Sequence, residues 1–79
     1  MQGRRIPDNT GPHLYKPGDY GLFGGKWYAK TPNDLLGDLS GHEVALHDDG
    51  AITASPSILC DQGDVSWHGY LERGVWRKC

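Results

Sequence analysis

Six side chains of the sequence could ligate a soft metal or serve nucleophilic chemistry: His13, His42, His47, Cys60, His68 and Cys79. Zinc sites are usually built from two close pairs, such as Cys-x2-Cys and His-x3-5-His. His42 and His47 have such a spacing, but five residues apart on an expected strand they point to opposite faces. Cys60 and His68 flank a loop and could converge with His47 and Cys79. We expect no metal and no cofactor, with a small metal-binding or catalytic domain using Cys60 and His68 as the alternative.

Enzyme chemistry has little support in the sequence. A Cys60–His68 nucleophile pair would need a third group to orient the histidine, together with an oxyanion pocket. The chain lacks Gly-x-Ser-x-Gly, a phosphate-binding loop ending in Lys-Ser/Thr, and His-Glu-x-x-His. Asp48 and Asp49 could be paired carboxylates, but the following Gly50 favours a turn. Since 79 residues seldom build both a core and a deep pocket, we predict a non-enzymatic protein without catalytic residues.

Charge is distributed in three blocks along the chain. Residues 1–30 carry +3 and residues 73–79 carry +3, whereas residues 31–72 carry −8 and contain neither Lys nor Arg. A solvated surface normally mixes the two signs. Either the basic ends fold back over the acidic middle, or the middle forms an acidic surface that complements a basic partner.

Two other classes of partner are not expected. Residues 15–30 interleave aromatic residues with Lys16, Lys26 and Lys30, as a base-stacking platform does, but an acidic middle would repel phosphate. The sequence has no run of about 18 apolar residues and no apolar stretch behind Arg4 and Arg5. We therefore expect no direct nucleic-acid binding, no membrane contact, a cytoplasmic location and two free cysteines.

Short strands are expected to position these side chains. "HEVALHDDGAITA" (42–54) alternates on both sides of Asp49-Gly50, which predicts a hairpin. Pro56 should interrupt the ladder with a bulge or crossover. Alternation over 65–72 places Ser66, His68, Tyr70 and Glu72 on one face and Val65, Trp67, Gly69 and Leu71 on the other. Arg73-Gly74 should then turn the chain into 75–79.

The remaining elements complete a β-rich domain. Residues 1–18, with three prolines and three glycines, predict an irregular arm, and 20–23 and 25–30 predict short strands. "TPNDLLG" (31–37) predicts one short helix near 32–36, capped by Thr31 and ended by Gly37. We expect a single domain over 1–79: a small antiparallel sheet or partly open barrel of five or six short strands with one helix.

A resemblance adds an expected origin. "DGAITASPSI" (49–58) and "WHGYLERGVW" (67–76) resemble a pattern found in small accessory proteins of phages and prophages, over roughly residues 41–78. Some relatives have a cysteine-rich, metal-binding N-terminal half, but residues 1–40 here contain no cysteine. The resemblance implies a phage accessory protein, and small acidic proteins of this kind suggest, by analogy, an anti-CRISPR-like inhibitor of host defence.

The predicted function is inhibition by binding. The partner would be a host protein with a basic, nucleic-acid-binding surface, because spaced carboxylates can take the places of phosphates. The protein itself would be a monomer or homodimer, and a self-associating module pairing through the edge 75–79 is a further alternative. We expect electrostatic contacts from five carboxylates and anchoring contacts from two other side chains: Asp48, Asp49, Asp61, Asp64 and Glu72, with His68 and Tyr70.

Overall fold

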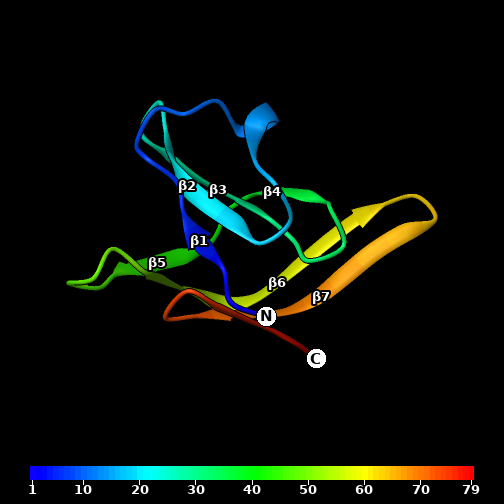
Figure 1. Ribbon diagram of the computed structural model, residues 1–79. Coiled ribbons are helices and arrows are strands. Elements are labelled where there is room, and N and C mark those ends of the chain that lie inside the picture. Colours follow the sequence, from blue (N-terminus) through cyan, green and yellow to red (C-terminus); the bar gives the residue numbers. More distant parts are fainter.

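Alternation and glycine turns produce eight strands in two sheets. The computed structural model describes residues 1–79, and Figure 1 shows the two sheets one above the other. The first sheet, in the order β1-β2-β3-β4, comprises β1 (Arg4–Arg5), β2 (Asp19–Phe23), β3 (Lys26–Lys30) and β4 (Leu36–Asp38). The second, in the order β5-β6-β7-β8, comprises β5 (Glu43–Leu46), β6 (Ile52–Gln62), β7 (Val65–Glu72) and β8 (Val75–Lys78). β1 and β2 are parallel, and all other neighbours are antiparallel.

This architecture confirms the mainly β prediction and corrects its details. The strands number eight rather than five or six, and they form two open sheets rather than one small sheet or a partly open barrel. The only helical segment is the 3-10 turn η1 (Pro12–Leu14). The chain contains no helix with the length and apolar character needed to cross a bilayer.

Turn chemistry sets the register of the hairpins. Arg73 (φ 48°) and Gly74 (φ 76°) both adopt left-handed conformations between the paired residues Glu72 and Val75. Such a two-residue turn matches the right-handed twist of the flanking strands. The turn between β5 and β6 uses Gly50 at φ 88°. Both predicted hairpins are therefore confirmed.

The predicted helix near 32–36 is wrong. Residues 31–35 form the loop of the β3–β4 hairpin, in which Lys30 pairs with Leu36. The Thr31 hydroxyl accepts a hydrogen bond from the Leu35 amide at 2.9 Å, and the Thr31 amide donates to the Leu35 carbonyl at 2.7 Å. Asp34 has φ 73°, which a right-handed helix does not allow. Thr31 caps a loop instead of a helix.

We expect Thr31→Val to destabilise the protein by about 1–3 kcal/mol, because Leu35 would keep a buried amide without its side-chain acceptor. Thr31 is 0% exposed, so water cannot replace the hydroxyl. Urea denaturation measures the change in unfolding free energy. Thr10→Val is the matched control, since Thr10 makes no side-chain hydrogen bond, and it should stay within about 0.5 kcal/mol of the parent. Equal stability of the two variants would contradict the capping role.

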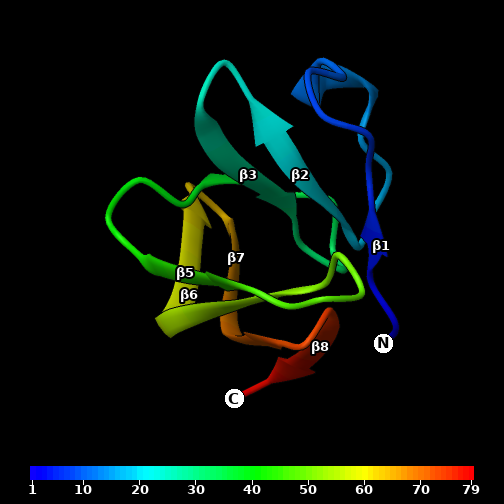
Figure 2. The ribbon, with the colours of Figure 1, turned by 90° about the vertical axis from the view of Figure 1, so that its left-hand side faces the viewer.

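A bulge near Pro56 bends the long strand β6, as the proline predicted. The pairing register between β6 and β7 shifts between Ala54 and Ile58. The first part of β6 pairs with β5, and the part from Ile58 to Gln62 pairs with the start of β7. Figure 2 shows the resulting change of direction in β6. The β5–β6 turn and the β6–β7 turn lie at the two ends of this 11-residue strand.

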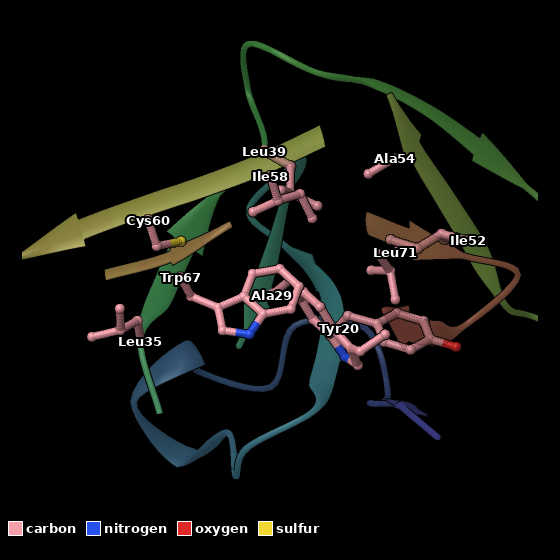
Figure 3. Close-up of a cluster of buried hydrophobic side chains, with 11 residues drawn as sticks. Tyr20, Ala29, Leu35, Leu39, Ile52, Ala54, Ile58, Cys60, Trp67 and Leu71 are labelled. Carbon is pink, nitrogen blue, oxygen red and sulfur yellow. The ribbon is translucent and has the colours of Figure 1, made fainter. Parts of the chain in front are cut away.

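The core lies between the two sheets. Eleven buried side chains meet there, and Figure 3 shows most of them converging from both sides: Tyr20, Ala29, Leu35, Leu39, Ile52, Ala54, Ile58, Cys60, Trp67, Leu71 and Trp76. The rings of Trp67 and Trp76 pack edge to face, with centroids 5.2 Å apart at 84°. Such a pair adds to the free energy gained by burying two large apolar side chains. Both tryptophans are therefore part of the scaffold.

Residues 1–18 contain only β1 and η1 as regular structure, and they contact both sheets. Ile6 donates its amide to the Tyr20 carbonyl of the first sheet at 2.8 Å. Gly3 donates to the Gly74 carbonyl of the second sheet at 2.8 Å, and Trp76 Nε1 donates to the Gly18 carbonyl at 3.0 Å. The segment therefore connects the two sheets by hydrogen bonds.

Candidate partner-binding surface

The outward side of the second sheet carries part of the predicted site. We call this side the outer face and define it by eight residues of β6, β7 and β8: Ser57, Leu59, Ser66, His68, Tyr70, Glu72, Val75 and Arg77. Alternation put His68, Tyr70 and Glu72 on one side of β7, and the structure confirms that all three are exposed. Leu59 pairs with His68 and is 66% exposed. An exposed leucine beside a histidine and a tyrosine is typical of a protein-binding surface.

Contacts on the outer face link its polar side chains. His68 Nε2 lies 2.8 Å from Ser57 Oγ. The Arg77 guanidinium lies 5.2 Å from the centre of the Tyr70 ring and forms an ion pair with Glu72. Glu72 is thus neutralised within the chain, and it is a weaker candidate for contacting a basic partner than the sequence predicted.

The four predicted aspartates do not form one patch. Asp48 and Asp49 lie in the β5–β6 turn, whereas Asp61 and Asp64 lie at the β6–β7 turn, at the opposite end of the molecule in Figure 1. At the first end, Arg73 lines the same hollow as both aspartates. A base beside these carboxylates reduces their attraction for a basic partner.

The ion pairs show how far the basic ends neutralise the acidic middle. Within residues 31–72, Asp34 pairs with Lys30 at 3.5 Å and Glu72 pairs with Arg77. The two remaining ion pairs lie within residues 1–30. Six exposed carboxylates of the middle block therefore have no ion-pair partner: Asp38, Glu43, Asp48, Asp49, Asp61 and Asp64. Folding back of the basic ends accounts for only part of the charge pattern.

Asp38 lines the same surface hollow as Asp61, although the sequence-based prediction of the binding site did not include Asp38. Both residues line one hollow of about 200 Å³ between β4 and the end of β6. Hydrogen bonds from Ser40 hold the pKa of the Asp38 carboxyl below its usual value, and a weaker attraction from Lys26 acts in the same direction. Asp38 is therefore charged at neutral pH. The pairing of Asp38 with Tyr28 in the first sheet was not predicted, because the pattern of residues 31–37 favoured a helix.

We call Asp38, Asp61 and Asp64 the acidic end. Exposed apolar side chains border it, with Leu59 66% exposed and Val65, in the same turn region, 46% exposed. Carboxylates that surround exposed apolar side chains offer both long-range attraction and an apolar contact. The acidic end thus combines carboxylates that have no ion-pair partner with exposed apolar side chains.

The alternative site on Cys60 and His68 is not assembled. Cys60 pairs with Trp67 and points into the core, whereas His68 is the next residue along β7 and points outward. Burial raises the pKa of the Cys60 thiol, which keeps it protonated and weakly nucleophilic. No three His, Cys, Asp or Glu side chains of the chain are grouped to hold one ion.

The other two histidines of the acidic block make hydrogen bonds to β6. His42 Nε2 lies 3.1 Å from the Ser57 carbonyl, and His47 Nε2 lies 2.8 Å from Thr53 Oγ1. These contacts hold the two ends of β5 against the neighbouring strand. Both imidazoles therefore have structural roles.

Comparison of the chain with family models, curated proteins and solved structures found no match. The likeness of residues 41–78 to phage accessory proteins stays an expectation. Function is therefore inferred from the residues of the chain itself.

Proposed function

We propose that this protein is a non-enzymatic inhibitor that binds a basic, nucleic-acid-binding surface of a host protein through its acidic end. The supporting observation is that Asp38, Asp61 and Asp64 are exposed, unpaired with any base and bordered by exposed apolar side chains. Carboxylates at such a surface take the positions that phosphates would occupy and exclude nucleic acid. The partner would be a defence complex in the host cytoplasm, and the resemblance to phage proteins favours a CRISPR effector.

The outer face supplies a second, weaker group of contacts. Tyr70 is held in place by the Arg77 guanidinium, and Leu59 lies opposite His68 on the neighbouring strand, two residues before Asp61 of the acidic end. Rigid aromatic and apolar side chains act as anchors in interfaces, whereas exposed charges mainly set the association rate and its salt dependence. In this proposal the acidic end attracts the partner and the outer face adds apolar area.

We expect the double variant Asp61→Lys/Asp64→Lys to weaken partner binding by tenfold or more, because it reverses two charges at the acidic end. Capture from host lysate on the immobilised protein supplies the partner, and titration of the purified partner gives the dissociation constant. The same titration with labelled nucleic acid present measures displacement. Affinity should also fall as salt is raised from about 0.05 to 0.3 M.

The matched control is Asp48→Lys/Asp49→Lys, which makes the same charge change at the opposite end. Its effect should be smaller, since Arg73 already lies beside these aspartates. Equal losses in both double variants would assign the effect to net charge rather than to the acidic end. Binding that survives Asp61→Lys/Asp64→Lys, or that ignores salt, would refute the proposal.

A further inference from the structure

The β7–β8 hairpin brings His68 and Cys79 opposite each other. Gly69 pairs with Lys78, so the next residues on the two strands, His68 and Cys79, also face one another. The Cys79 amide donates to the His68 carbonyl at 3.0 Å. Because paired residues place their side chains on the same side of a sheet, both side chains lie on the outer face.

The two side chains present a nitrogen and a sulfur at short range. His68 Nε2 and Cys79 Sγ are 3.9 Å apart, and both residues are exposed. Zinc binds thiolate sulfur at about 2.3 Å and imidazole nitrogen at about 2.0–2.1 Å, so two ligands of one tetrahedral ion lie roughly 3.5 Å apart. A small rotation of either side chain brings the pair to that separation.

The neighbouring Ser57 is compatible with a metal at this position. Ser57 Oγ lies 2.8 Å from His68 Nε2, and this hydrogen bond is exposed to solvent. When a metal binds Nε2, the serine hydroxyl can bond to water instead.

One chain supplies only half of a zinc site. A structural zinc has four protein ligands, and no third His, Cys, Asp or Glu of this chain joins His68 and Cys79. The position of the pair allows a second copy to approach. Met1 and Gln2 pair with the backbone of Trp76 and Val75 along the free edge of β8. No other segment forms backbone hydrogen bonds along that edge from Arg77 to Cys79.

We propose that two copies of the chain share one zinc-type ion, each contributing His68 and Cys79 to a Cys2His2 site. Two thiolates balance the charge of a divalent ion, and the two neutral imidazoles complete a tetrahedron. A two-fold axis through the ion relates the copies, as in most homodimers. Each cysteine releases its proton when it binds. This site uses the outer face rather than the acidic end, and the observations behind it are independent of the inhibitor proposal.

Zinc titration of the full chain in a thiol-free phosphine reductant tests the proposal, with mass read by light scattering and metal content by elemental analysis. We expect a dimer with one zinc per two chains, which EDTA returns to monomer. Cobalt in place of zinc should show tetrahedral bands together with thiolate-to-cobalt charge transfer. His68→Ala and Cys79→Ser should each abolish zinc binding and the dimer.

Cys60→Ser is the matched control, because this thiol points into the core, and it should bind zinc and dimerise like the parent. Three results would overturn the proposal: no zinc bound, one zinc per monomeric chain, or a dimer that persists in EDTA or in His68→Ala. A dimer that forms only without reductant and without zinc would be a Cys79 disulfide and would also overturn it. Partner binding that continues in a monomeric protein would leave the inhibitor proposal intact.

Discussion

Gly69→Ala is expected to remove about 3 kcal/mol of folding free energy, which is a large share of the stability of a domain this small. A Cβ at this position would lie 2.9 Å from the Lys78 Cα and would collide with the Arg77 carbonyl and the far edge of the Trp67 ring. Two of these three neighbours are backbone atoms of the adjacent strand, so they cannot move without opening the β7–β8 hairpin. Urea denaturation followed by tryptophan fluorescence measures the loss.

Gly41→Ala provides the control for this substitution. A Cβ at Gly41 would have no other atom within 4 Å, and Gly41 does not adopt a left-handed conformation. The change should therefore leave stability within about 0.5 kcal/mol of the parent or raise it slightly. If Gly69→Ala were as stable as Gly41→Ala, the close packing of Trp67 over β7 and β8 would be wrong.

Trp76→Ala should cost about 3–5 kcal/mol, the range for removing a buried aromatic side chain. Trp76 is 2% exposed, packs against the Trp67 ring and donates Nε1–H to the Gly18 carbonyl. Trp76→Phe keeps most of the apolar contact and loses the hydrogen bond, so it should cost less, about 1–2 kcal/mol. Thermal and urea denaturation of both variants give the two values.

The neighbouring residue offers a control on the same strand. Val75 is exposed on the outer face, and Val75→Ala should change stability by about 0.5 kcal/mol or less. A Trp76→Ala variant no less stable than Val75→Ala would show that Trp76 is not part of the core. A Trp76→Phe variant as unstable as Trp76→Ala would assign most of the effect to the bond with Gly18.

Local rules predicted the second sheet well. Period-two alternation put Trp67 and Leu71 inside and His68 and Tyr70 outside, because strand geometry depends on nothing beyond the neighbouring residues. The turn at Arg73-Gly74 also fixes which residues face each other. Counting back from it would have placed His68 opposite Cys79, so that pair was accessible from the sequence.

Long-range structure was beyond those rules. Thr31, Pro32 and Gly37 are common both at helix ends and in hairpin loops, and only the pairing of β4 with β3 decides between the two. The charge pattern likewise does not show where the charged residues lie in the folded chain. A net charge of −8 over 31–72 does not show that Asp48 and Asp61 lie at opposite ends, because the extended strand β6 between them sets that distance.

The hydrogen bonds made by residues 1–18 have a consequence for how the chain folds. Gly3 bonds to Gly74, and Gln2 bridges Val75, so residues more than 70 positions apart must meet before the N-terminal segment is bound to the second sheet. Such distant contacts are costly in chain entropy and slow the search for the native state. The same segment bonds to both sheets, and the two sheets share one core, so opening either sheet disrupts contacts of the other. We therefore expect the two sheets to gain and lose order together, in a single cooperative transition.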